Sequence, residues 1–184
     1  LVISVARDAE LPRIVLGGGS NTLVADAGFD GFVIRMANRD ICIEGTTVIA
    51  GAGAITSAVA RVAGEAGLTG FEWAVSLPGT IGGAVRGNAG CFGGEMKDVI
   101  EHVRVLNRNN ELRITNYGNK ECDFRYRHST FKEHPELVII EVTLQLTHGN
   151  AEQSRAQMDE FLAKRRAKQP LERPSAGCLF KNIE

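Results

Sequence analysis

An α+β fold is the class that the sequence predicts, and three observations lead to it. Short apolar runs separated by glycine and Asp/Asn turns dominate the first fifty residues, as expected for the strands of small sheets. Two other stretches show the periodicity of helices. Strands and helices then mix without the strict alternation of a doubly wound sheet. With 184 residues, the chain can bury a core as one domain or as two small ones.

The expected elements of the first half are strands and one helix. Five runs are typical of strands: LVISV, RIVLG, GFVIRM, ICIEG and TVIAG. Residues 22–26 are expected to form a loop with a short strand. Residues 55–66 predict a helix that ends at a C-cap glycine, Gly67. Its expected apolar face holds Ile55, Val59, Val62, Ala63 and Ala66.

The second half is expected to contain a hairpin, a long strand and a long helix. Residues 98–108 alternate apolar and polar side chains, and ELRIT follows an Asn109-Asn110 turn, which predicts a hairpin. Residues 136–148 predict one long strand. Asn150 is expected to cap a helix over 151–169 that ends at Pro170. Its inward-facing residues are Met158, Phe161 and Leu162.

Composition excludes several classes of protein. A net charge of -1 gives no long-range attraction to nucleic acid or to an anionic membrane. No apolar run approaches the roughly 20 residues of a membrane span, and the start LVISVARD lacks the pattern of a signal peptide. The cysteines form no CxxC pair, so we expect no metal site, reduced thiols and a cytoplasmic location. We expect Cys42, Cys91 and Cys122 to be structural.

Two glycine clusters need an explanation, because glycine loses more backbone entropy on folding than other residues. The first, Gly17-Gly18-Gly19-Ser20-Asn21, directly follows a predicted strand. It is either a tight turn between strands or a concavity of backbone amides that binds an anion. It is not a Walker loop, since no GKS or GKT follows.

The second cluster lies in SLPGTIGGAVRGNAGCFGGE, residues 76–95, which hold seven glycines. Around Thr80 and Ile81, Gly79, Gly82 and Gly83 are expected to leave backbone amides and one hydroxyl free to approach a pyrophosphate. No carboxylate lies among these glycines, as a metal site would require. Two such clusters in one small chain favour a dinucleotide ligand.

Four motifs in order resemble one enzyme family. GGGSNTLV, GFEWAVSLPGTIGGAVRGNAGCFGGE, FRYRHSTFK and KQPLERPSAGCLFKN are similar in order and spacing to the UDP-N-acetylenolpyruvoylglucosamine reductases, the MurB family of peptidoglycan precursor synthesis. The resemblance implies the two-subdomain FAD-binding fold of vanillyl-alcohol-oxidase-type flavoproteins. It also implies noncovalent FAD, NADPH as the hydride source and UDP-N-acetylglucosamine enolpyruvate, reduced to UDP-N-acetylmuramate, as the substrate. We expect FAD-binding subdomains at 1–67 and 68–167, and the start of a substrate domain at 168–184.

The resemblance also assigns roles to individual residues. It implies that Gly17, Gly18, Gly19, Ser20 and Asn21 form one FAD phosphate loop. It implies that Pro78, Gly79, Thr80, Gly82, Gly83 and Ala84 form the second, with Asn88 near the flavin. Arg127 matches the active-site arginine, and Cys178 falls at the position of the proton donor. Tyr126, Lys168 and Asn182 resemble substrate-binding positions.

The implied chemistry suits the two catalytic candidates. Hydride addition places negative charge on the enolpyruvyl carboxylate, and the planar guanidinium of Arg127 can bind that carboxylate through two hydrogen bonds. A cysteine with an ordinary pKa of about 8.5 is protonated near neutral pH, so Cys178 can serve as a general acid. Phe92 replaces the tyrosine that is common in the family's NAG-x-YG element.

Two other functions stay open at this point. One is an FAD-dependent oxidase or dehydrogenase of the same superfamily; the other is a module that binds a nucleotide without catalysis. The family's catalytic glutamate would lie beyond residue 184, and the chain opens at Leu1 inside an apolar run. We therefore expect a fragment of a longer protein, inactive by itself.

Overall fold

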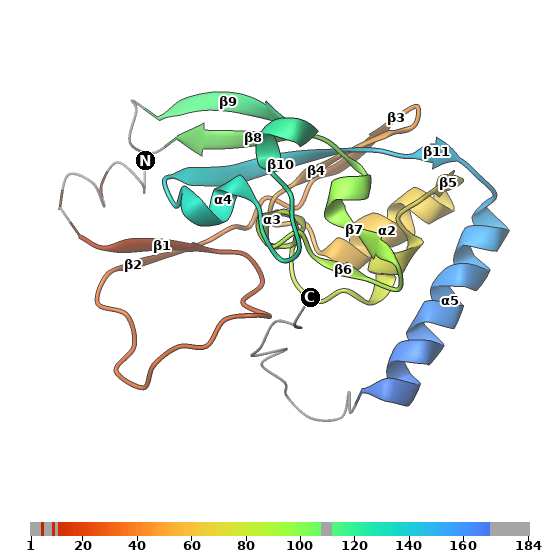
Figure 1. The fold of residues 1–184 in the computed structure, drawn as a ribbon, viewed down its shortest axis with the longest axis horizontal. Coiled ribbons are helices and arrows are strands. Elements are labelled where there is room, and N and C mark those ends of the chain that lie inside the picture. The colour runs from red at the N-terminus through yellow and green to blue at the C-terminus, as the bar shows by residue number, and fades with distance from the viewer. Residues whose placement is uncertain (1–4, 6–8, 10, 108–111, 170–184) are drawn as a thin grey trace.

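The computed structural model describes residues 5, 9, 11–107 and 112–169. It contains one five-stranded sheet, several two-stranded sheets and helices gathered beside them, so the α+β class is confirmed (Figure 1). The expected strand over 1–5, the Asn109-Asn110 turn and Pro170 lie outside these residues, except for Val5. Of the helices in the described part of the chain, none combines the length and apolar character that a bilayer crossing requires.

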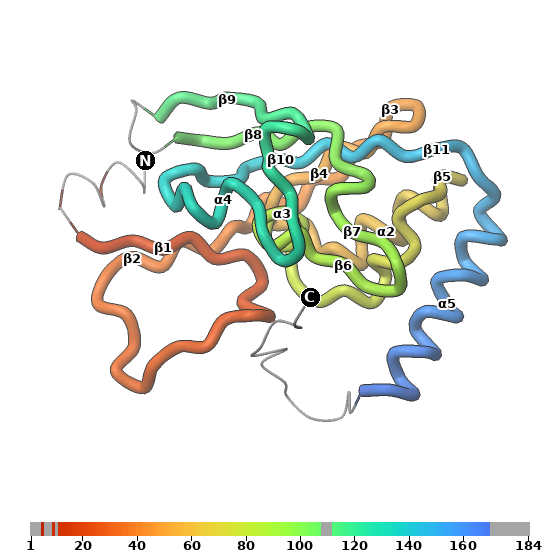
Figure 2. Tube along the Cα trace, in the orientation of Figure 1, coloured from red at the N-terminus to blue at the C-terminus, as the bar shows by residue number. Residues whose placement is uncertain are grey.

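A small parallel sheet of two strands is separate from the large sheet. It pairs β1 (Arg13–Leu16) with β2 (Phe32–Arg35), at the lower left of Figures 1 and 2. Parallel strands need a long connection, and residues 17–31 supply it as an exposed loop. The short strand expected over 22–26 is wrong, because Leu23 and Val24 lie in solvent with no strand beside them in the described chain.

The larger sheet has the strand order β3-β4-β10-β8-β9 and is antiparallel throughout. Its strands are β3 (Ile41–Glu44), β4 (Thr47–Gly51), β8 (Ile100–Asn107), β9 (Arg113–Gly118) and β10 (Leu137–Gln145). The predicted pairing of 98–108 with ELRIT is confirmed as β8 and β9. The sheet joins strands from both sides of residue 67, the expected boundary between subdomains, and that division stays a prediction.

The predicted long strand over 136–148 is divided between two sheets. After β10, the short β11 (Thr147–His148) leaves the large sheet and pairs with β5 (Leu68–Thr69). This change of partner brings the chain to α5 (Ala151–Lys168), the predicted long helix. Asn150 caps α5 as expected, since its side-chain oxygen accepts hydrogen bonds from the amides of Glu152 (2.9 Å) and Gln153 (3.1 Å).

The first long helix, α2 (Thr56–Glu65), is correct in extent, but its buried face differs from the prediction. The buried apolar residues are Val59, Ala60 and Ala63, joined by Gly64, whereas Ile55 and Ala66 are exposed. Ile55 precedes the helix in extended backbone, so it never joins the helical face. Gly64 packs against α5, where a Cβ would lie 2.8 Å from the Met158 methyl carbon.

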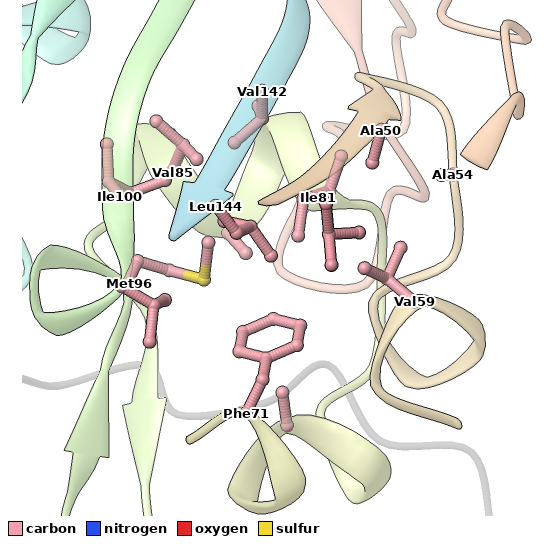
Figure 3. Close-up of a cluster of buried hydrophobic side chains, with 14 of the residues drawn as sticks. Ala50, Ala54, Val59, Phe71, Ile81, Val85, Met96, Ile100, Val142 and Leu144 are labelled. Carbon is pink, nitrogen blue, oxygen red and sulfur yellow. The ribbon is translucent and has the colours of Figure 1, made fainter. Parts of the chain in front are cut away.

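The hydrophobic core fills the space between the large sheet and the helices on one side of it (Figure 3). Val142 and Leu144 of β10 face Ile81 and Val85, which belong to α3 (Ile81–Arg86). Phe71 closes the far side of the core just before the 3-10 helix η1 (Glu72–Ser76). The remaining short elements are β6 (Gly90–Cys91), β7 (Gly94–Glu95), η2 (Met96–Asp98), η3 (Asn119–Cys122) and α4 (Thr130–Glu133).

Candidate functional site

The two glycine clusters, distant in sequence, lie against each other. A Cβ on Gly17 would lie 2.2 Å from Thr80 Oγ1, and a Cβ on Gly18 would lie 3.0 Å from the Gly79 Cα. The side chain of Ser20 borders Gly79 in the same way, since a Cβ there would lie 2.6 Å from Ser20 Oγ. Glycine at positions 17, 18 and 79 lets the two loops come this close, since a Cβ at each position would lie 3.0 Å or less from an atom of the other loop. The loop after β1 and the loop before α3 therefore form one site.

Thr80 is the polar residue at the centre of this contact. It is buried, and its hydroxyl oxygen has no hydrogen-bond partner within the described chain. An unpaired buried hydroxyl costs free energy, so its position beside two glycine loops indicates a ligand partner. Gly83, one turn into α3, is exposed beside that hydroxyl.

One part of the second cluster differs from expectation. The amide of Gly82 is not free, because it donates a hydrogen bond to the Ala52 carbonyl (3.0 Å), and the amide of Ile81 donates to the Ala54 carbonyl (2.9 Å). A Cβ on Gly82 would lie 2.8 Å from the Ala52 Cβ. Position 82 therefore needs glycine to pack α3 against the chain after β4. Ala84 is buried in α3, whereas Pro78, Gly19 and Asn21 are exposed at the loops.

Arg127 lies in a tight turn between η3 and α4. The amide of His128 donates to the Arg125 carbonyl (3.0 Å) and that of Arg125 to the His128 carbonyl (3.2 Å), which closes a turn with Tyr126 and Arg127 at its corner. Arg127 has a φ of 52°, a left-handed conformation that costs a non-glycine residue on the order of 1 kcal/mol. Such strain at a predicted catalytic residue is consistent with a functional constraint.

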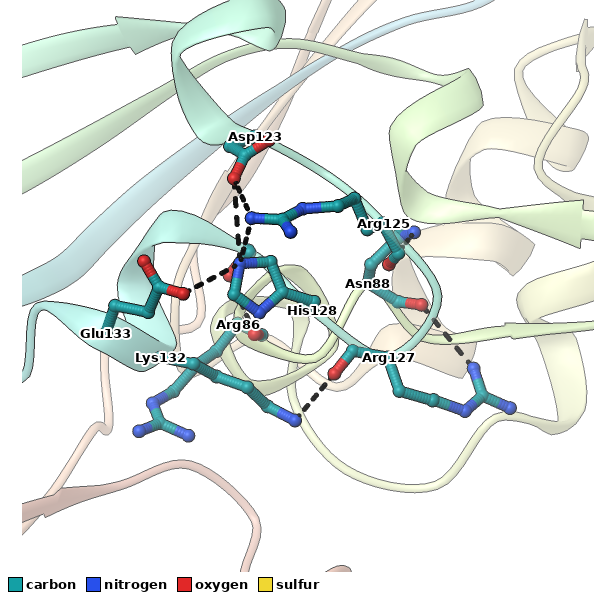
Figure 4. A network of polar contacts seen from close by, with 9 residues as sticks. Arg86, Asn88, Asp123, Arg125, Arg127, His128, Lys132 and Glu133 are labelled. Atoms are coloured by element: carbon teal, nitrogen blue, oxygen red, sulfur yellow. Dashed lines mark hydrogen bonds and ion pairs between the residues drawn. The ribbon is translucent and has the colours of Figure 1, made fainter. Parts of the chain in front are cut away.

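The guanidinium of Arg127 reaches back to the glycine-rich stretch (Figure 4). It donates to the carbonyls of Asn88 (3.4 Å) and Gly90 (3.3 Å) and lies 5.4 Å from the centre of the Tyr126 ring. Lys132 Nζ donates to the Arg127 carbonyl (2.7 Å). Lys132 ends the FRYRHSTFK motif, but its place in the motif alone does not predict this contact.

Asn88 is fully buried, and its side chain is occupied by protein partners. Its amide nitrogen donates to Glu95 Oε2 (2.9 Å) and to the Arg125 carbonyl (3.1 Å), and its oxygen accepts from the Lys97 amide (3.0 Å). The amide thus links the glycine-rich stretch to the Arg127 turn. A direct contact between Asn88 and a cofactor stays a prediction.

Phe92 connects the same stretch to α5. Residues 92 and 93 form the two-residue loop between β6 and β7, with φ angles of 53° and 88°, as in a type I′ hairpin turn. The Phe92 ring stacks on Phe161 with centroids 4.8 Å apart, and Arg165 lies 5.8 Å from the Phe92 ring centre. This contact anchors the half of α5 that ends at Lys168, an exposed residue. Arg165 lies near the C-terminal end of α5, and its position in the sequence gives no sign of its contact with the Phe92 turn.

Two predicted residues, Cys178 and Asn182, lie outside the described residues. Within the described part, no group of three or more His, Cys, Asp or Glu side chains is arranged to hold a metal ion. A cavity of about 470 Å³ lies between α2 and α5, lined by Val75, Met158 and charged side chains of both helices. Neither glycine loop contributes to its lining.

Comparison with known proteins places the chain in a family. Residues 1–116 match the family model described as FAD binding domain. UDP-N-acetylenolpyruvoylglucosamine reductases of Caldanaerobacter subterraneus and Lactiplantibacillus plantarum are each 43% identical over 181 residues, or 98% of this chain and 59% of the relative. The chain therefore spans about 59% of the length of these curated relatives.

Solved structures give the same result. The crystal structure of UDP-N-acetylenolpyruvylglucosamine reductase (MurB) from Thermus caldophilus aligns with a TM-score of 0.82 and 36% identity, over 97% of this chain and 64% of that one. The 6-hydroxy-D-nicotine oxidase of Arthrobacter nicotinovorans (TM-score 0.55, 21% identity, 79% of this chain and 33% of that one) shares the fold alone. This chain belongs to the FAD binding domain family and is a relative of the UDP-N-acetylenolpyruvoylglucosamine reductases.

Proposed function

We propose that this chain is the FAD-binding part of an NADPH-dependent reductase that converts UDP-N-acetylglucosamine enolpyruvate to UDP-N-acetylmuramate. The observation that carries the proposal is the contact of Gly17 and Gly18 with Gly79 and Thr80. The identity to reductases of this name supports the substrate and the reaction. The low-identity oxidases share only the fold, so no observation favours an oxidase.

The residues at the glycine contact fit the pyrophosphate of FAD. Gly17–Asn21 and Pro78–Ala84 contain no carboxylate, and the unpaired Thr80 hydroxyl can donate to a phosphate oxygen. Gly19 and Gly83 leave the approach open, while Ser20 adds a second hydroxyl at the rim. When bound, FAD would supply the hydride chemistry, which no side chain of the protein can perform. The binding is proposed to be noncovalent.

Arg127 is proposed to hold the carboxylate of the enolpyruvyl group. When hydride adds to the double-bond carbon farther from the carboxylate, the electron pair left on the nearer carbon delocalises into that carboxylate. A permanent cation with parallel N–H donors stabilises this charge. The hydrogen bonds from Arg127 to the Asn88 and Gly90 carbonyls are long, at 3.4 and 3.3 Å, and are therefore weaker than the charge-assisted bonds that a carboxylate would accept. The guanidinium can therefore exchange a carbonyl partner for a substrate anion.

The other roles follow from the resemblance. Cys178 is proposed to give its thiol proton to the carbon next to the one reduced, and Tyr126, Lys168 and Asn182 to bind the substrate. Lys168, exposed at the end of α5, is available to an anionic group. We further propose a cytoplasmic enzyme divided at residues 67 and 167 into two FAD-binding subdomains and the start of a substrate domain.

A two-step experiment tests the function. The complete gene product is purified and its visible spectrum recorded before and after acid denaturation; we expect a flavin that acid releases. NADPH oxidation is then followed with and without UDP-N-acetylglucosamine enolpyruvate, with NADH as the comparison. A protein that stays colourless after incubation with FAD contradicts cofactor binding. A yellow protein that oxidises NADPH at the same rate with and without the substrate contradicts only the proposed reaction.

A further inference from the structure

Asn88 and the Arg127 turn are joined by two hydrogen bonds, each from a side chain to a backbone carbonyl. The Asn88 side chain donates to the Arg125 carbonyl (3.1 Å), the first residue of the Arg127 turn. The Arg127 side chain donates in return to the Asn88 backbone carbonyl (3.4 Å). Each residue therefore fixes the backbone from which the other side chain extends (Figure 4).

Both residues adopt left-handed backbone conformations, with φ of 41° at Asn88 and 52° at Arg127. Asn tolerates this region better than most residues, whereas Arg does not. The turn at Arg127 therefore needs outside support to persist. Asn88 supplies it from the core side, because its own amide is fixed by Glu95 and by the Lys97 amide. Lys132 supplies it from α4 by donating to the Arg127 carbonyl.

We propose that Asn88 is a positioning residue for Arg127 and not a contact of the cofactor. Its buried amide locks the strained turn so that the guanidinium points at the glycine-rich stretch. All three hydrogen bonds of the Asn88 side chain go to protein groups, and the residue is 0% exposed. This inference rests on the proposed function in one respect only, the role of Arg127 toward the substrate.

The decisive variant is Asn88→Asp in the complete, FAD-loaded gene product. Aspartate keeps the size, the left-handed tolerance and the acceptor for the Lys97 amide, but it cannot donate to the Arg125 carbonyl and it faces the Glu95 carboxylate. The matched control is Asn119→Asp. Asn119 also donates to two backbone carbonyls, of Lys97 and Ile100 (both 2.8 Å), and within the described residues neither bond goes to the Arg127 turn.

Three quantities are measured for each variant: the melting temperature, the dissociation constant for FAD, and the rate of flavin reoxidation by substrate in stopped flow. We expect both variants to lower the melting temperature. Only Asn88→Asp should slow reoxidation, by ten-fold or more, with FAD affinity within about three-fold of wild type. Adding Arg127→Lys to Asn88→Asp should cost much less than Arg127→Lys costs alone, since the guanidinium is already misplaced.

Several results would overturn the proposal. These are a ten-fold loss of FAD affinity with normal reoxidation at saturating FAD, multiplicative effects of the two substitutions, or equal slowing by the Asn119 control. If Asn88→Asp does not fold, Asn88→Gly is used. Glycine keeps the left-handed backbone and the backbone carbonyl that accepts from Arg127, and it removes the side-chain hydrogen bond to the Arg125 carbonyl. A wild-type protein that is not reoxidised by the substrate refutes the proposed function instead, and the FAD dissociation constant of Asn88→Asp then decides the inference alone.

Discussion

Gly17 lies directly against Thr80, so close that a Cβ on Gly17 would be 2.2 Å from the threonine hydroxyl oxygen. The contact joins the end of β1 to the start of α3 and buries a hydroxyl that no described group satisfies. The unpaired hydroxyl therefore costs free energy in the ligand-free fold, at the place where the two glycine loops meet.

Replacing Thr80 by valine should have opposite effects on stability and on cofactor binding. Valine keeps the shape and removes the unpaired hydroxyl, so the ligand-free protein should gain about 1 kcal/mol in unfolding free energy. FAD affinity should fall about ten-fold, because one hydrogen bond to a charged group is lost. Urea denaturation and FAD titration measure the two effects. A loss of stability with unchanged affinity would show that the hydroxyl serves the fold.

Substitution of two glycines in the same stretch should separate those needed for packing from the others. A Cβ on Gly94 would lie 2.4 Å from the Trp73 ring, so Gly94→Ala should destabilise the protein by about 1–3 kcal/mol. Gly87→Ala is the matched control, because its nearest neighbour would lie at an ordinary 3.7 Å. Denaturation curves compare the two. Equal effects would mean that chain flexibility, and not the Trp73 contact, sets the requirement at 94.

Acid should weaken the attachment of α5 through Glu72. Burial alone raises the pKa of this carboxyl, but hydrogen bonds from Ser154, Thr69 and the backbone amides of Glu72 and Gly70 outweigh it and leave the pKa below its ordinary value. Because the pKa of Glu72 is lower in the folded protein than in the unfolded chain, where it is about 4.3, the ionised carboxylate stabilises the fold above about pH 4.3. This stabilisation is lost as the pH falls through the pKa of the folded protein.

The unfolding free energy between pH 7 and pH 3 tests this expectation. Glu72→Gln should flatten the decline below about pH 4.3. Glu65→Gln, at an exposed position on α2, serves as the matched control for removing one carboxyl. An unaltered slope in Glu72→Gln would assign the acid sensitivity to other carboxyls.

The thiols of the described residues should differ widely in reactivity. Burial raises the pKa of Cys122 to about 12, with a smaller contribution from Glu121. Burial also raises the pKa of Cys91, although Arg165 and Arg127 oppose it. The thiolate is the reactive form, so at pH 8 the exposed Cys42 should react first with a disulfide reagent, Cys91 more slowly, and Cys122 only on unfolding. Peptide mass spectrometry on a Cys178→Ala background reads the order; rapid labelling of Cys122 would contradict its burial.

The periodicity of apolar residues predicted most helices and strands. It failed where contacts between residues far apart in the sequence determine which side chains are buried. The strands of the large sheet and both long helices follow local patterns, including the Asn150 cap. The spacing of Ile55 fits a helical face, but Ile55 lies in extended backbone one residue before α2 begins at Thr56. Gly82 looks identical to Gly79 in sequence, yet only the position of Ala52 shows that it is a packing glycine. The hydrogen bond from Asn88 to the Arg125 carbonyl joins residues 37 positions apart, so no local sequence pattern predicts it.

Cys178 gives the sharpest test of the catalytic assignment, in the complete gene product. Cys178→Ala removes the proposed proton donor and changes no residue of either glycine loop, so flavin reduction by NADPH should stay near the wild-type rate. Flavin reoxidation by substrate should slow by about 10²–10⁴-fold, the usual contribution of a general acid. Cys178→Ser should retain more activity than Cys178→Ala, because a hydroxyl can still deliver a proton. Stopped-flow measurement of both half-reactions separates the steps, and slow reduction with normal reoxidation would exclude Cys178 as the proton donor.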